Sequence, residues 1–386
     1  MSLKASELSL LVGGAAVEQT PSQCEAWLQA ASTGDWTPIF KAALEHGTLA
    51  LVCWHLQALP DDALAPEIRE AAQKFLNQQR TTVEAGFAQW REVLGALERE
   101  GIAAIPYKGP VSASAFGELP WLRAFRDLDV LVREPDFDGA IACLEGMGYS
   151  SDGLPIAGWQ RNAIRRRARQ ETLYSSGLAV EPHYGFAQRS LGLELKVDDV
   201  FARARAGQVL GHEVRVMAPE DTFLVLALHG CKERWRRLVW VVDVAEYLKS
   251  NPDLDWDIAF RRARACGLER CSLLALHLAH ELLGAPVPAA WLRQARASPV
   301  CLELSARVKG AIANEAPIDK WSEVMRFQNA LLERNSDRLR AWTETVKDVR
   351  EGDYAAVRLP RATAGLYMLV KATRRISALL PRARPV

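Results

Sequence analysis

The stretch that most constrains this chain is residues 126–132, where Asp127 and Asp129 alternate with aliphatic residues. Such alternation over a short run predicts a β-strand with one apolar face. Because successive side chains of a strand point to opposite faces, both aspartates share the other face. Two neighbouring half-buried carboxylates repel each other unless a cation compensates them, and Mg²⁺ prefers carboxylate and phosphate oxygens. The pattern therefore indicates either a metal site or an exposed strand end whose two aspartates are solvated.

The residues before this strand place positive charge close to it. An apolar strand is predicted over residues 102–107, and it is followed by Lys108, Gly109 and a short helix. A strand that turns through glycine into a helix presents backbone N–H groups to which a phosphate can bind. Lys108 adds a cation at this turn, and Arg123 adds a second one shortly before Asp127. Lys108, Gly109 and Arg123 are therefore candidate nucleotide- or phosphate-binding residues.

A second strand with acidic character is predicted over residues 178–184, which include Glu181 and His183. One position separates the two residues, so their side chains share one strand face. If this strand lies beside the first one, Glu181 becomes a third carboxylate next to Asp127 and Asp129.

Taken in order, the Lys-Gly turn, Arg123 and the Asp-x-Asp strand resemble the polymerase-beta-like nucleotidyltransferase superfamily. The resemblance is specifically to its poorly characterised bacterial group of nucleotidyltransferase family proteins, and it covers most of the chain. Two departures are visible. The wider superfamily has Gly-Ser where this chain has Lys-Gly, and Glu181 is followed by a proline.

The resemblance implies a metal-dependent transfer of an NMP group from an NTP, with ATP as the favoured donor, to a hydroxyl or similar acceptor with release of pyrophosphate. It implies that Asp127 and Asp129 hold Mg²⁺, with Mn²⁺ as the alternative ion. Glu181 would be the third metal ligand or the general base, and His183 is a weaker candidate for that base. The acceptor is an unidentified small molecule or protein.

Two other functions fit the same residues. The site could transfer a phosphoryl group instead of a nucleotidyl group, or the chain could be a degenerate, non-catalytic module that binds a nucleotide or a partner. Analysis of the products separates the first alternative from nucleotidyl transfer. Nucleotide binding without pyrophosphate release would identify the second alternative.

A further group of candidates lies in the helical pattern after residue 219. It consists of His229, Lys232 and Trp235, followed by Asp243 on the next predicted helix. His229 and Lys232 are three residues apart and therefore lie on one helix face. As functional residues these four would orient the nucleotide or the acceptor across from the aspartates. As structural residues they would form an ion pair at a helix hairpin, with Trp235 in the core.

Composition limits the classes of function that fit the chain. Its 386 residues carry a formal net charge of +1, which argues against a dedicated nucleic-acid-binding protein. Seven scattered cysteines without metal-ligand spacing, the lack of a signal sequence and the lack of a membrane-spanning apolar run predict a cytoplasmic protein. The basic run over residues 161–169 is predicted to be a solvated face, with contact to phosphates as the alternative.

The C-terminal stretch carries only basic charge after Asp353, including Arg382 and Arg384 at its end. Apolar residues trace a stripe through this stretch, as they do in amphipathic helices. We expect the stripe to dock on the chain's own domain. Peripheral contact with an anionic membrane surface is the less favoured alternative.

These patterns predict an α+β protein with a small mixed nucleotidyltransferase-like sheet flanked by helices. Residues 1–100 are expected to form a helical region whose long last helix, from about residue 66 to 100, covers the sheet. Residues 101–217 are expected to form the catalytic domain, and the strand over residues 211–216 is expected to close its sheet. Residues 218–386 are expected to form a helical C-terminal domain.

Overall fold

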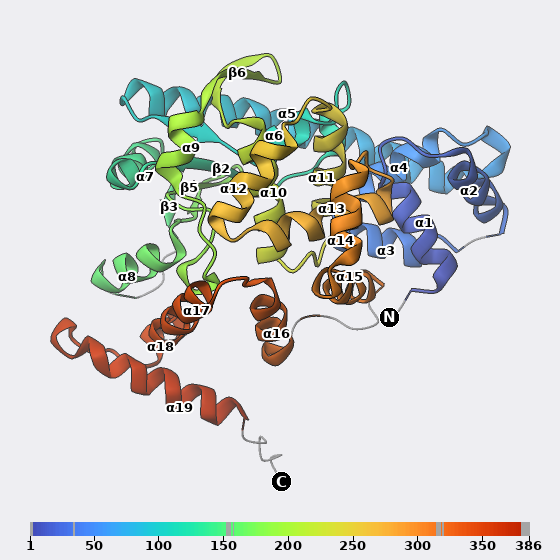
Figure 1. The fold of residues 1–386 in the computed structure, drawn as a ribbon. Helices are drawn as coiled ribbons and strands as arrows, with labels where there is room; N and C mark the ends of the chain where they lie inside the picture. The colour runs from blue at the N-terminus through green and yellow to red at the C-terminus, as the bar shows by residue number, and fades with distance from the viewer. Residues whose placement is uncertain are drawn as a thin grey trace, which may run out of the picture.

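The computed structural model describes residues 3–33, 35–151, 156, 158–313, 318 and 320–379. Helices predominate and surround a small mixed sheet, so the predicted α+β class is confirmed (Figure 1). The first hundred residues are helical, as expected. Their helices are α1 (Ala5–Ala15), α2 (Pro21–Thr33), α3 (Thr37–His46), α4 (Leu49–Gln57) and α5 (Pro66–Arg99).

Within the described residues, the main sheet has five strands in the order β1-β2-β5-β4-β3. Strands β2 and β5 are parallel, whereas the other neighbouring pairs are antiparallel. The strands are β1 (Ala104–Pro106), β2 (Asp127–Val132), β3 (Ser150–Ser151), β4 (Leu173–Tyr174) and β5 (Ala179–His183). The alternating stretch around the two aspartates is thus the second strand from one edge.

Helix α5 covers one face of this sheet. Its residues Val83, Phe87 and Trp90 recur at helical spacing and belong to the same buried cluster as Leu128 and Val130 of β2. The opposite face of β2 carries the aspartates, as the alternation predicts. Burial of the aliphatic face under α5 therefore fixes the direction in which the two carboxylates point.

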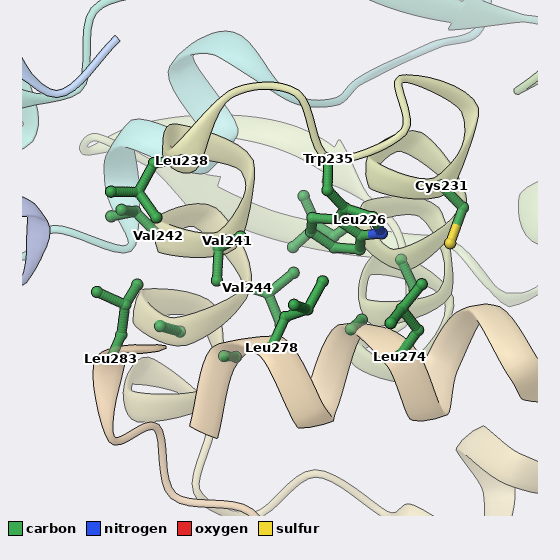
Figure 2. Packing of buried hydrophobic residues seen from close by; sticks show 14 of the residues in the cluster. Leu226, Cys231, Trp235, Leu238, Val241, Val242, Val244, Leu274, Leu278 and Leu283 are labelled. Atoms are coloured by element: carbon green, nitrogen blue, oxygen red, sulfur yellow. The ribbon is translucent and has the colours of Figure 1, made fainter. Parts of the chain in front are cut away.

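The remaining helices follow the strands or form the C-terminal half, where a second, larger core lies. Figure 2 shows a part of this core, in which side chains of α10 (Pro219–Lys232), α11 (Leu238–Ser250) and α13 (Glu269–Leu283) meet those of the turn after α10. The same cluster includes residues of α1, α3 and α4, so the N-terminal and C-terminal helices share one core.

Short 3₁₀ helices lie at Asp61–Ala63, Pro120–Leu122, Glu134–Asp136, Arg189–Leu191 and Arg361–Leu366. The α-helices are α6 (Gly109–Ser114), α7 (Phe137–Gly146), α8 (Gly158–Ala168), α9 (Val197–Arg203), α10 (Pro219–Lys232), α11 (Leu238–Ser250), α12 (Trp256–Cys266), α13 (Glu269–Leu283), α14 (Ala289–Ala297), α15 (Pro299–Ile312), α16 (Trp321–Leu331), α17 (Asn335–Lys347), α18 (Glu351–Ala356) and α19 (Tyr367–Leu379).

The strand predicted over residues 211–216 exists as β7 (His212–Val216), but it does not close the main sheet. It pairs with β6 (Arg205–Val209) in a separate two-stranded sheet, so that part of the prediction was wrong. The reason is the two-residue turn between them. Leu210 and Gly211 both have positive φ, 51° and 75°, and two such residues fold a chain back on itself as a tight hairpin.

The C-terminal helices α17–α19 lie at one corner of the molecule, far from the N-terminal helices (Figure 1). Helix α19 contacts α17, because the Lys371 ammonium donates to the carbonyl oxygens of Thr345 and Val346 at 2.6 and 2.7 Å. Leu366 and Leu369 of the predicted apolar stripe are nevertheless exposed, so that part of the stripe does not dock. The predicted basic residues Arg382 and Arg384 lie outside the described residues. Of the helices that the structure describes, none has the length and apolar character needed to span a membrane.

Candidate active site

The parallel pairing of β2 with β5 brings three carboxylates together. Asp129 lies directly beside Glu181 in the register, and Asp127 is beside Ala179. Because residues paired across a sheet point to the same side, Asp127, Asp129 and Glu181 share one face. His183 follows on that face of β5. The two acidic strands thus lie side by side, which is the condition under which Glu181 joins the two aspartates.

Lys108 completes this cluster from the turn after β1. Its Nζ donates to Asp129 Oδ1 at 2.7 Å, and the pair is largely buried. The turn needs unusual backbone angles, because Lys108 has a φ of 55° and Gly109 a φ of 40°. A Cβ at Gly109 would also lie 3.3 Å from the carbonyl oxygen of Asp127. Glycine therefore allows the turn to approach β2 closely, which brings the Lys108 ammonium to Asp129.

Glu181 is held by two residues that sequence analysis did not identify. Thr172 Oγ1 donates to one of its carboxylate oxygens at 2.7 Å and Gln170 Nε2 to the other at 3.0 Å. Both residues come from the segment that returns antiparallel onto β5, where Gln170 forms a bridge with His183. No motif marks them, because their place depends on this return of the chain. They fix the orientation of the Glu181 carboxylate.

His183 is almost fully buried, with 2% of its surface exposed. Its Nε2 lies 2.7 Å from Asp129 Oδ1 and 3.4 Å from Glu181 Oε2. The ring of Tyr107, another residue that the sequence did not single out, packs edge-on against the imidazole at 5.3 Å between centroids. The imidazole therefore points at the carboxylates from within the sheet.

The two aspartates differ sharply in their electrostatics. Burial raises the pKa of Asp127 to about 6, and the neighbouring Asp129 and Glu181 charges add to this effect. Burial alone would also raise the pKa of Asp129, but the Lys108 ammonium and the His183 imidazole hold it well below its usual range. Asp129 is therefore the compensated charge of the pair, whereas Asp127 is ionised at a cost.

The chemistry of the donors fits a divalent metal ion. One ligand atom each from Asp129, Glu181 and His183 lies within 4.8 Å of the others. Carboxylate oxygens and an imidazole nitrogen are common ligands of divalent ions. Among the described residues, Asp127 does not belong to this group of three close ligand atoms, although its side chain lies on the same face of the sheet. Three of the four residues predicted for catalysis thus meet at one point.

Arg123 is engaged by Asp243. Its Nε and Nη2 donate to the two carboxylate oxygens at 2.5 and 2.7 Å, and both side chains are largely buried. This bidentate pair joins the segment before β2 to α11. Its charge is therefore partly neutralised where the sequence predicted a phosphate contact.

His229 and Lys232 at the end of α10 face the same cluster. Burial lowers the pKa of Lys232, and the nearby Lys108 ammonium lowers it further. Burial, followed by the charges of Lys108 and Lys232, lowers the pKa of His229 well below its usual value. Trp235 is placed differently, because it is fully buried among the apolar residues shown in Figure 2. The four second-group candidates thus divide into two that face the carboxylates, one that binds Arg123 and one in the core.

The basic run over residues 161–169 lies on α8 and at its end, and much of its charge is paired. Arg165 contacts Glu171, Arg167 contacts Asp348 and Arg169 contacts Glu194. These are contacts within the chain, made largely by partly buried side chains. The run is therefore less solvated than predicted, because α8 is covered by the C-terminal helices.

Comparison with known proteins identifies the family of the chain. A family model described as uncharacterised nucleotidyltransferase matches residues 32–284, which include every candidate residue named above in the two acidic strands and α10. A search of the curated proteins finds no match. Among solved structures, the antibiotic-resistance factor ANT(2'')-Ia matches with a TM-score of 0.31 and 12% identity, over 49% of this chain and 91% of that chain. A similarity of this degree supports no statement about the fold or the substrate. The family match, which spans more than half of the sequence, is sufficient by itself: the chain belongs to the family of uncharacterised nucleotidyltransferases.

Proposed function

We propose that this protein transfers an NMP group from an NTP, with ATP as the favoured donor, to a hydroxyl-bearing acceptor and releases pyrophosphate. The observation that carries the proposal is the register of β2 and β5. It sets the carboxylates of Asp127, Asp129 and Glu181 on one face, with the Lys108 ammonium 2.7 Å from Asp129. Carboxylates fixed in this way can hold divalent ions, and such ions, together with the ammonium, would stabilise the negative charge on a transferring phosphoryl group.

Asp129, Glu181 and Asp127 would hold the divalent ions that the family implies, Mg²⁺ or Mn²⁺. When bound, such ions supply charge neutralisation at the phosphates and lower the pKa of a coordinated hydroxyl. Glu181 is oriented by Thr172 and Gln170, so it is also placed to accept the proton of the acceptor hydroxyl. His183 is the alternative acceptor of that proton.

Lys108 in the turn after β1 and Lys232 at the end of α10 support a triphosphate site beside the carboxylates. The ammonium groups of Lys108 and Lys232 are close enough for each to disfavour positive charge on His229. Like charges held together in a buried place repel each other, and an anion between them removes that cost. We assign the triphosphate to these residues, with the Arg123–Asp243 pair fixing the neighbouring backbone.

The acceptor is assigned to the opposite side, where β4 lies. A cavity of about 310 Å³ is lined there by Gln170 and Thr172, the two residues that bind Glu181, and by Arg161 and Glu171. Its polar lining fits a polar, hydroxyl-bearing molecule. Because β2 and β5 lie between β1 and β4, the carboxylates would stand between donor and acceptor.

The test uses each of the four NTPs labelled at the α-phosphate, with a cell extract divided into small-molecule and protein fractions as the source of acceptor. Transfer of the label to one fraction, with release of pyrophosphate, is expected for the native chain. Asp129→Asn should abolish transfer, whereas the exposed control Asp253→Asn should leave it unchanged. Transfer of a γ-phosphate label instead would identify a phosphotransferase. Nucleotide binding without any transfer would identify the non-catalytic module.

A further inference from the structure

Neither ring nitrogen of the His183 imidazole makes a well-aligned hydrogen bond within the described part of the chain. Nδ1 has no hydrogen-bond partner among the described residues, and the side chain is 98% buried. Nε2 lies 2.7 Å from Asp129 Oδ1 as an ion-pair contact, but its N–H is not aligned for a hydrogen bond. Buried polar groups are normally paired, and an unpaired one calls for an explanation such as an ion that binds there. The His183 ring does not lie in purely apolar surroundings, because Nε2 is next to the carboxylates of Asp129 and Glu181.

The strand geometry aims Nε2 at the oxygens that a metal ion would use. The atom lies 2.7 Å from Asp129 Oδ1 and 3.4 Å from Glu181 Oε2. These distances bring one nitrogen and two carboxylate oxygens into a single group whose members all lie within 4.8 Å of one another. Asp127, the ligand expected from the sequence, is not a member of this group. Small side-chain movements would let the three residues share one ion.

The donor set indicates the class of ion. Mg²⁺ and Ca²⁺ favour oxygen ligands only, whereas first-row transition ions also accept imidazole nitrogen readily. A set of two carboxylates and one imidazole therefore discriminates in favour of the transition ions. Lys108 does not supply this selectivity, because its ammonium offers donors and no lone pair.

We infer that His183 is a metal ligand, and that Asp129, Glu181 and His183 bind a divalent first-row transition ion such as Mn²⁺ in preference to Mg²⁺. This inference rests on the proposed function, whose metal site it makes specific. It assigns His183 to the metal instead of to the proton of the acceptor.

The experiment measures nitrogen coordination directly, without nucleotide or acceptor. Mn²⁺ is added to the full-length protein, and pulsed electron paramagnetic resonance detects magnetic coupling between the ion and nearby nitrogen nuclei. We expect a nitrogen coupling in the native protein that changes to the ¹⁵N pattern when the histidines are labelled with ¹⁵N. In a parallel calorimetric titration, we expect His183→Gln to weaken Mn²⁺ binding about tenfold or more and to affect Mg²⁺ binding less.

The matched control is His277→Gln, which removes another buried histidine with an unpartnered Nδ1. The coupling should persist in this variant and disappear in His183→Gln. Bound Mn²⁺ without a nitrogen coupling, a coupling that survives His183→Gln, or no Mn²⁺ binding to the native protein would overturn the inference. If His183→Gln does not fold, the ¹⁵N-labelled native protein still decides whether a histidine binds the ion.

Failure of this inference and failure of the proposed function give different results. Mn²⁺ bound by oxygen ligands only, together with Mg²⁺-supported transfer of the α-phosphate label, would reject His183 as a ligand and leave nucleotidyl transfer intact. Nitrogen coordination without any transfer of the label would support the metal ligand and reject the reaction.

Discussion

The two aspartates of β2 should affect stability in opposite directions when each is neutralised. Asp127 is mostly buried, and its pKa rises from 3.8 to about 6. One pKa unit corresponds to about 1.4 kcal/mol, so ionisation of this carboxyl costs the folded state about 3 kcal/mol above pH 6. Asp127→Asn mimics the neutral form and should therefore stabilise the protein by up to about 3 kcal/mol at pH 8.

The sign of the pH dependence follows from proton linkage. Between pH 3.8 and 6 the folded state keeps a proton on Asp127 that the unfolded state has lost, so the native protein loses stability as the pH rises through this range. At pH 4.5 only about 1 kcal/mol of the penalty is present. The advantage of Asp127→Asn should accordingly grow from about 1 to about 3 kcal/mol between pH 4.5 and pH 8.

Asp129→Asn should have the opposite effect. Its carboxylate accepts from the Lys108 ammonium at 2.7 Å, and its pKa is held well below the usual value. Neutralising it leaves the largely buried Lys108 charge without its partner, which costs roughly 3 kcal/mol, at the low end for a broken buried pair because asparagine still offers an oxygen. This stabilisation by Asp129 is complete above pH 3.8 and is lost as the pH falls below that value.

The assay is urea-induced unfolding followed by tryptophan fluorescence, in EDTA so that no divalent ion compensates the carboxylates. The free energy of unfolding is measured at pH 8 and pH 4.5 for the native protein and both variants. The exposed control Asp253→Asn should change it by less than about 0.5 kcal/mol. Loss of stability in Asp127→Asn at pH 8, or a gain of equal size at both pH values, would refute the reasoning.

Three further changes test other parts of the structure. Asp243→Ala leaves the bound Arg123 without its partner and should cost about 3–5 kcal/mol, and a double-mutant cycle with Arg123→Ala should be strongly non-additive in the unfolding free energy. Additive losses would show that the pair contributes nothing. Gly230→Ala would place a Cβ 2.4 Å from the ring of Trp235, and we expect a loss of about 3 kcal/mol in urea unfolding; an unchanged value would show that the ring can move away. Lys371→Met removes the ammonium that binds the last carbonyls of α17, so trypsin should cleave within α19 faster while the melting temperature of the main core stays the same. Unchanged cleavage would mean that other contacts hold α19.

The parts of the fold that the sequence predicts are those with a local periodic signal. The alternation around Asp127 and Asp129 gives β2 and its two faces, and the helical spacing of Phe87 and Trp90 gives α5. Burial of one face leaves a single possible direction for the polar side chains. The shared face of Glu181 and His183 followed from the same period of two.

The parts that the sequence could not give depend on pairings between distant segments. The hairpin turn at Leu210 and Gly211 makes β7 pair with β6. The glycine in the sequence does not by itself show whether the strand after it joins the main sheet or the strand before it. Gln170 and Thr172 reach Glu181 only because the chain returns onto β5. Arg123 pairs with Asp243, which is 120 positions away in the sequence. The partial neutralisation of its charge could therefore not be read from a local pattern.

The sequence also treats Asp127 and Asp129 as equivalent, whereas the fold makes them unequal. Lys108 neutralises Asp129 and leaves Asp127 ionised at a cost. Burial and the nearby Lys108 ammonium also lower the pKa of Lys232, so its positive charge is held at a cost. Both costs are of a kind that a ligand removes, a cation for the carboxylates and an anion for the lysines. Residues selected for stability alone would not retain a carboxylate that is ionised at a cost and a buried ammonium whose pKa is lowered, and sites that do so sacrifice stability for binding. The cost of charge at Asp127 and Lys232 therefore supports the proposal that a metal ion and a phosphate-bearing substrate bind here together.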